Sequence, residues 1–152
     1  MISIDDELDQ SRFRLEALSM LTSYIEMCSQ YFFDEASTDT TNNKTLSDFT
    51  AAANLGFEAN DAGYVDDFDD FNNLVIPDTG RSGVVYNVSF EVDYVTLSGN
   101  QIVTSSDKQY HKQMIIHIFD SYNPPLLIKS QGGTEVRDTL SISFVYSYWF
   151  YN

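Results

Sequence analysis

The period of the side-chain pattern after Gly83 constrains the fold of this chain more than any other feature. From residue 84 to residue 94, apolar and aromatic side chains alternate with polar ones, which is the period of a half-buried β-strand. The alternating residues are Val84, Tyr86, Val88, Phe90, Val92 and Tyr94. Residues 140–150 repeat the pattern with Leu140, Ile142, Phe144, Tyr146, Tyr148 and Phe150. With further strands expected near residues 101–106 and 111–120, the sequence predicts an antiparallel meander of three or four strands with one solvated face.

The N-terminal segment has the period of a helix instead. Its apolar residues recur at steps of three, four and seven, and so they line one helical face. They are Leu8, Leu15, Leu18, Leu21, Ile25, Cys28 and Phe32. Acidic residues 5–7 would lie in the first turn, where the helix dipole favours negative charge. We expect one helix that ends at residue 33 and packs its apolar face on the sheet.

Residues 34–83 show no period and are rich in Ser, Thr, Asn, Asp and Gly, which predicts a long connection. A connection of this length usually has a function. The expected fold is therefore an α+β domain spanning residues 1–152. It would consist of a helix (1–33), an acidic connecting loop (34–83) and an antiparallel sheet (84–152).

The charge balance excludes one class of partner. The chain has 23 acidic and 8 basic residues, a formal net charge of -15, so a nucleic-acid backbone would be repelled. Cys28 is the single cysteine, so no intrachain disulfide can form, and its place in the apolar helical stripe predicts a buried, inert thiol.

The sequence offers few candidates for catalysis, and we expect no enzyme. His111 and His117 would share a strand face but lie about 20 Å apart, so they could not hold one ion. Asp78, Thr79 and Gly80 match the tripeptide of retroviral-type aspartic proteases, but a turn rich in Pro, Asp and Gly explains the same letters.

The stretch "GYVDDFDDFNN" places four aspartates in five positions: Asp66, Asp67, Asp69 and Asp70. One interpretation is a structural turn, in which Phe68 and Phe71 are buried while the aspartates face solvent, cap backbone N–H groups or pair with Arg81. A second is a calcium site made of the four carboxylates, because calcium prefers hard oxygen ligands in flexible geometry. A third is a recognition surface for a partner.

Three stretches, in order along the chain, resemble a known family. The first is "FRLEALSMLTSYIE" with "YFFDEAS" closing the helix, and the second is "VDDFDDFNN". The third comprises "YNVSFEVDYV" and "KQMIIHI" leading to "LSISFVYSYW". Together they resemble type IV pilin-like proteins, especially minor pilins of the mannose-sensitive haemagglutinin type and type II secretion pseudopilins. In the family's acidic motif an aliphatic residue stands at the position of Phe68 and a glycine at that of Asn73.

The resemblance implies a non-enzymatic subunit of a type IV pilus or secretion pseudopilus, with other pilin or pseudopilin subunits as partners. It also implies an apolar, membrane-anchoring half of the helix upstream of Met1. The full-length form would then be anchored in the inner membrane before it joins an extracellular filament of the cell envelope, and residues 1–152 would form a soluble, monomeric head. The alternative is a calcium-dependent extracellular module that binds a glycan or a protein.

Overall fold

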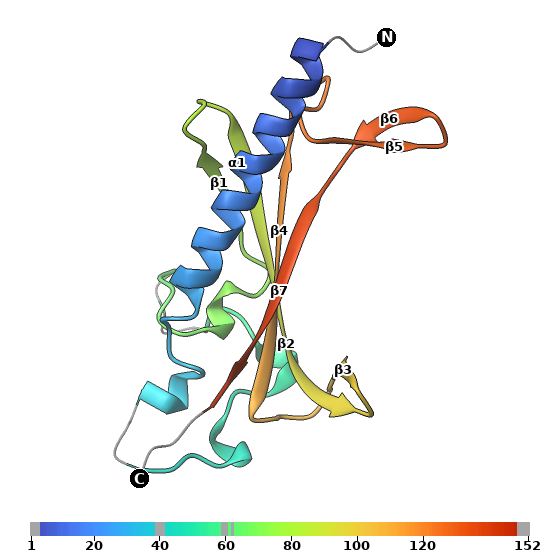
Figure 1. The fold of residues 1–152 in the computed structure, drawn as a ribbon. Helices are drawn as coiled ribbons and strands as arrows, with labels where there is room; N and C mark the ends of the chain where they lie inside the picture. Colours follow the sequence, from blue (N-terminus) through green and yellow to red (C-terminus); the bar gives the residue numbers. More distant parts are fainter. Residues whose placement is uncertain (1–3, 39–41, 59–60, 62, 149–152) are drawn as a thin grey trace. The chain divides into compact units, whose positions relative to one another are not determined.

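The computed structural model describes residues 4–38, 42–58, 61 and 63–148 (Figure 1). The α-helix is α1 (Ile4–Cys28), followed by the short 3-10 helices η1 (Glu35–Thr38), η2 (Leu46–Asp48), η3 (Ala52–Asn54) and η4 (Asp69–Phe71). The strands are β1 (Val75–Thr79), β2 (Val85–Ser98), β3 (Gln101–Thr104), β4 (His111–Asp120), β5 (Ile128–Gln131), β6 (Thr134–Arg137) and β7 (Leu140–Ser147). Among these residues, no helix combines the length and apolar character that crossing a bilayer requires.

The strands form two sheets. The larger has five strands in the order β1-β2-β4-β7, with β3 paired to β2, and the smaller is the β5-β6 pair (Figure 1). β1 runs antiparallel to β2, with Val75 opposite Ser89 and Thr79 opposite Val85. β3 is likewise antiparallel to β2, and β6 to β5.

The expected α+β class, with a helix on a meander of three or four strands, is wrong. The described residues form a β-rich fold with one α-helix, a five-stranded sheet and a second, two-stranded sheet. The expectation missed β1 because Pro77 interrupts an otherwise strand-like run. Proline is tolerated only at sheet edges, and β1 is at the end of the strand order. The expectation also lacks the β5-β6 hairpin, whose turn contains Gly132 and Gly133. Both adopt positive φ (60° and 81°), which suits a tight turn between paired strands.

The period-two prediction itself is confirmed for β2. Tyr86, Val88, Phe90, Val92 and Tyr94 are each at most 1% exposed, so one face of this strand is fully buried. Along β7 the half-buried residues also alternate with exposed ones from Leu140 to Phe144. Phe150, expected on the same face, lies outside the described residues.

The chain forms two compact units. The first comprises residues 1–25, 75–89 and 116–142, and the second comprises residues 26–74, 90–115 and 143–152. Since β2, β4 and β7 are long, each contributes residues to both units.

In the first unit, α1 is held by both packing and polar contacts. Ala17 and Leu21 are fully buried. The carboxylate of Glu16 accepts hydrogen bonds from the Tyr86 hydroxyl (2.9 Å) and from the backbone N–H of Ser82 (2.9 Å). A Cβ at Gly80 would meet this carboxylate, which would then have to shift.

The apolar stripe of the helix differs from the expected one. Leu15 and Leu18 are 66% and 43% exposed, whereas Ala17, Leu21 and Cys28 are fully buried. The buried arc is thus turned away from Leu15 and Leu18. The helix also ends at Cys28 and not at residue 33. Beyond it, Phe32 forms a parallel bridge with Asp67, and its carbonyl oxygen accepts the backbone N–H of Phe68 (2.8 Å).

The second unit has an aromatic core. Phe33, Phe49, Leu55 and Tyr94 form one buried cluster, against which Tyr146 and Tyr148 pack. The Tyr94 hydroxyl donates to the carbonyl of Thr50 (2.6 Å), which joins the connection to β2. Residues 42–58 are therefore packed and not a loose loop, although they contain only short 3-10 turns.

We predict that Leu21→Ala lowers the free energy of unfolding by about 2–5 kcal/mol, because it leaves a cavity at a fully buried site. Leu15→Ala is the matched control on the same helix. Its side chain is 66% exposed, so the expected change is within about 0.5 kcal/mol. Urea denaturation followed by circular dichroism measures both. Equal effects of the two substitutions would contradict the observed orientation of α1.

Candidate metal centre

The acidic stretch is a buried turn. Phe68 and Phe71 are 0% and 2% exposed, as the structural-turn interpretation predicted. Of the roles that this interpretation gave the aspartates, capping of backbone N–H groups is confirmed for Asp67 and Asp70. Exposure to solvent is confirmed for Asp66 alone, since Asp67, Asp69 and Asp70 are fully buried. The two phenylalanines anchor the turn, since Phe68 stacks on Tyr146 and Phe71 lies 5.2 Å from Phe90 between ring centroids.

Two of the aspartates organise the backbone of the turn. Asp70 Oδ2 accepts the N–H groups of Asp66 (2.8 Å) and Asp67 (3.3 Å). Asp67 Oδ1 accepts those of Asp69 (3.1 Å) and Asp70 (3.2 Å). One oxygen of each carboxylate is therefore committed to backbone donors. Asn73 follows with φ of 65°, the left-handed conformation that a glycine adopts most readily.

Asp69 has a different partner, Lys112 on β4. The ammonium group donates to Asp69 Oδ1 (3.0 Å), Asp34 Oδ2 (3.0 Å) and the Phe33 carbonyl (2.6 Å). Its Nζ also lies 4.4 Å from the centroid of the Phe33 ring. Lys112 is 0% exposed, and its three donors match three acceptors, which is the condition under which a buried charge is tolerated. Arg81, the partner expected from the sequence, is exposed.

A second group of carboxylates gathers beside this ion pair. Ligand oxygens lie within 4.8 Å of one another in four triads: Glu35–Glu58–Asp61, Glu35–Asp66–Asp67, Glu58–Asp67–Asp70 and Asp61–Asp66–Asp70. We call these six residues the carboxylate cluster. Each belongs to two triads, and every pair shares a triad except Glu35–Asp70, Glu58–Asp66 and Asp61–Asp67. The triads thus overlap through shared residues, and together they form one continuous group of carboxylates.

Several oxygens of the cluster are buried without a hydrogen-bond partner. Asp67 Oδ2, Asp70 Oδ1, Asp61 Oδ1 and Glu58 Oε2 are in this condition. The other oxygen of each is occupied, for example Glu58 Oε1 by the Thr50 hydroxyl (3.2 Å) and Asp61 Oδ2 by the backbone N–H of Glu58. An unpaired buried carboxylate oxygen is costly, so such groups call for a ligand or ion to explain them.

The pKa values of the cluster residues reflect their burial and their closeness to one another. Burial, together with the charges of Asp69 and Asp70, raises the pKa of Asp67 to about 9. Burial raises the pKa of Asp70 to about 7, although backbone donors oppose the shift. Burial and neighbouring carboxylates also raise the pKa of Glu35 and that of Glu58. Negative charge is therefore unfavourable in this cluster.

The structure brings together three of the four aspartates that the sequence suggested as calcium ligands. Asp66, Asp67 and Asp70 join the cluster, whereas Asp69 is directed to Lys112. Sequence reasoning missed Glu35, Glu58 and Asp61, which lie in the preceding connection. Their one sequence signal is an acidic side chain within a long polar segment, and this does not reveal which of them converge.

Other candidate residues have structural partners. Cys28 is buried, and burial raises the pKa of its thiol to about 12, which agrees with an inert thiol. His111 and His117 lie 2.6 Å from the hydroxyls of Ser147 and Ser141, respectively. Asp78 accepts a hydrogen bond from the Tyr24 hydroxyl (2.8 Å), so the Asp-Thr-Gly triplet joins β1 to the helix.

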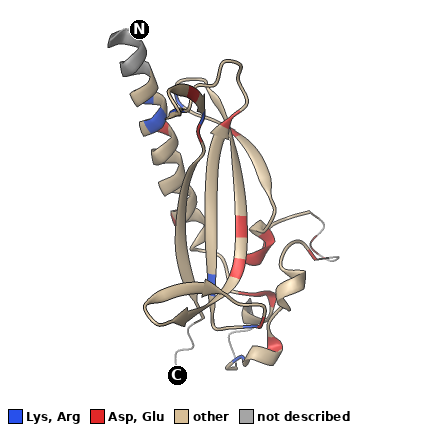
Figure 2. Cartoon of the chain, turned by 90° about the vertical axis from the view of Figure 1, so that its right-hand side faces the viewer, with Lys and Arg blue, Asp and Glu red and all other residues tan. Residues whose placement is uncertain are grey.

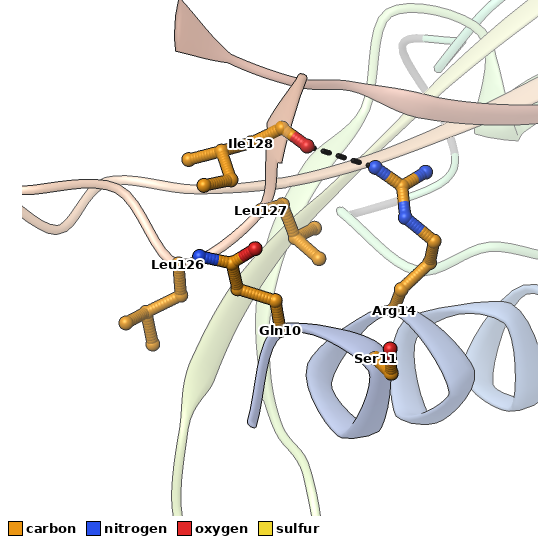
Figure 3. A pocket seen from close by; sticks show the side chains of 6 residues that line it. All are labelled: Gln10, Ser11, Arg14, Leu126, Leu127 and Ile128. Carbon is orange, nitrogen blue, oxygen red and sulfur yellow. Dashed lines mark hydrogen bonds between the residues drawn. The ribbon is translucent and has the colours of Figure 1, made fainter. Parts of the chain in front are cut away.

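The first unit contains a hollow of about 390 Å³ between the N-terminal half of α1 and residues 126–128 (Figure 3). Its lining is Gln10, Ser11, Arg14, Leu126, Leu127 and Ile128. Arg14 is its one ionisable residue, and the guanidinium already donates to the Ile128 carbonyl and to Asp138, both at 2.9 Å. This lining offers no acid–base pair.

No protein-family model, curated protein or solved structure matches the chain. Its chemistry therefore has to be inferred from its own residues. Figure 2 shows that acidic segments are frequent in the short turns and loops of the chain and that basic segments are few. All groups of three or more potential metal ligands found among the described residues consist of members of the carboxylate cluster.

We predict that Lys112→Met lowers the free energy of unfolding by about 3–5 kcal/mol, because it leaves Asp34 and Asp69 buried without their counter-charge. Lys129→Met is the control: that side chain is 54% exposed and 4.0 Å from Asp138, so its loss should cost about 1 kcal/mol or less. Denaturant unfolding monitored by tyrosine and tryptophan fluorescence compares the two. A small effect of Lys112→Met would contradict the role of this ion pair.

Proposed function

We propose that this protein is a non-enzymatic structural subunit of a pilin-type filament, a type IV pilus or a secretion pseudopilus. Under this proposal its partners are other pilin or pseudopilin subunits, and it assembles through α1. An apolar anchor, which the family resemblance implies, would hold it in the inner membrane of the cell envelope before it enters an extracellular filament.

The observation that carries the proposal is an uncharged, exposed stripe on α1. Ser11, Leu15, Leu18 and Thr22 follow one another at steps of four, three and four, and all four are exposed. Residues at these spacings lie on one helical face. In a chain with a net charge of -15, a surface stripe of two leucines between small hydroxyl residues suits packing against another helix better than contact with solvent.

The conformation of the acidic turn adds support. The family motif has a glycine where this chain has Asn73, and Asn73 takes the positive φ of 65° that a glycine would supply. This positive φ is compatible with a glycine at the same position of the family motif. Phe68, which replaces an aliphatic residue, fills a fully buried position.

A calcium-dependent extracellular binding module is the second candidate, and the carboxylate cluster favours it. A module that recruits a glycan or a protein through calcium must leave part of the ion's coordination open. Asp61, Asp67 and Asp70 are at most 6% exposed, Glu35 and Glu58 are half-buried, and Asp66 is exposed, so an ion held by the cluster would be enclosed on the side of the three buried aspartates. This arrangement suits a cation that supports the fold better than one that presents a ligand.

Leu15→Glu and Leu18→Glu test the filament proposal in the full-length protein in its own cells. A charge in a helix–helix contact is costly to bury, so incorporation into sheared surface filaments, measured by immunoblot, should fall about tenfold or more. Ser23→Glu adds the same charge at another exposed helical position and should incorporate normally. Circular dichroism of the purified variants confirms that they fold. Normal incorporation of both leucine variants would overturn the proposal.

A further inference from the structure

We propose that the carboxylate cluster binds a calcium ion that fastens the polar connection to the acidic turn. The ligands are Glu35, Glu58, Asp61, Asp66, Asp67 and Asp70, which come from three separate stretches of the second unit. The inference goes beyond the filament proposal and does not rest on it, since it concerns the isolated chain.

The unpartnered oxygens point to a ligand independently of the acidic composition. Asp67 and Asp70 are 0% exposed, and Asp61 is 6% exposed. Each directs one oxygen to backbone donors and keeps the other, in reach of neighbouring carboxylate oxygens, without a hydrogen bond. An acidic patch that served only solubility would instead expose these oxygens to water.

The number and chemical type of the ligands indicate which ion the cluster would bind. The cluster contains no sulfur or nitrogen ligand, which disfavours zinc and copper. Calcium accepts six to eight oxygens in flexible geometry, whereas magnesium usually retains several waters and takes one or two carboxylates. Six protein carboxylates that face one another therefore suit calcium better than magnesium.

The ion would close a loop of the chain. Glu35 lies shortly after α1, and Glu58 and Asp61 lie near the middle of the connection, before the acidic turn. A cation shared by these residues and the turn would fix both ends of residues 36–57, so its removal should loosen that segment. Lys112 already holds the same region through Asp34 and Asp69, so the fold is expected to persist without calcium in a less stable form.

Thermal unfolding of the purified chain is the primary test, in calcium, in magnesium, in a chelator, and in sodium chloride at matched ionic strength. At calcium about a hundred times its Kd, the midpoint should rise by about 5–10 °C over the chelator value. The magnesium and sodium chloride samples should rise much less. Equal midpoints in calcium and chelator would overturn the inference, and so would an equal rise with sodium chloride or magnesium.

Asp67→Asn and Asp70→Asn locate the site. Asparagine keeps one oxygen for the backbone N–H groups and replaces the unpartnered oxygen with an amide. Both variants should lose the calcium-dependent rise, and in chelator both should be at least as stable as the wild type. Asp107→Asn, at an exposed position of the same unit, should keep the full rise. A full rise in the two cluster variants, or its loss in Asp107→Asn, would refute the assignment.

Limited trypsin digestion measures how accessible the connection is to the protease. Lys44 is the single lysine or arginine between Arg14 and Arg81, and it lies in the segment that the ion would close. Calcium should slow cleavage after Lys44 relative to cleavage after the exposed Arg81 in the same sample, which corrects for any effect on the protease. An unchanged ratio of the two cleavage rates would contradict the proposed role of the ion.

Discussion

The ammonium group of Lys112 is the interaction on which the second unit depends. It is fully buried, and its three donors reach one backbone carbonyl and two aspartates. Asp34 in turn accepts the backbone N–H of Thr50 (2.9 Å). The ammonium group of Lys112 therefore links β4 to the segment after α1, to the connection and to the acidic turn. Removal of either the ammonium group or the two carboxylates would leave the remaining charge unpaired in a low-dielectric interior, which is strongly destabilising.

The carboxylates beyond this pair follow a common design. A buried aspartate accepts backbone N–H groups with one oxygen, or both, and so stabilises a turn. Asp120 does this in the first unit, where it accepts the N–H groups of Tyr122, Leu126 and Leu127 and is balanced by Arg137. In the carboxylate cluster the same device is repeated without a basic residue for each acid, and negative charge accumulates as a result.

The long strands with alternating side chains, β2 and β7, were the predictable part of this fold, because a period of two records burial on one face directly in the sequence. Tyr86 through Tyr94 illustrate this. The helix was predictable in existence but not in orientation, since its apolar residues span more than one arc and only the packed structure shows that Ala17 and Leu21, and not Leu15, are buried. Pro77 concealed β1. The site depended on contacts over long sequence separations: Lys112 and Asp69 are 43 residues apart, and no local pattern connects Glu35 or Glu58 to the acidic turn.

The proline within β1 limits how copies of this protein can associate. β1 is only five residues long and lies at the end of the strand order, and Pro77, at its centre, has no N–H group to donate to an incoming strand. An edge strand of this kind is a poor template for extending the sheet from one molecule into the next. Growth of an ordered polymer by strand addition is therefore disfavoured at the β1 edge of the sheet.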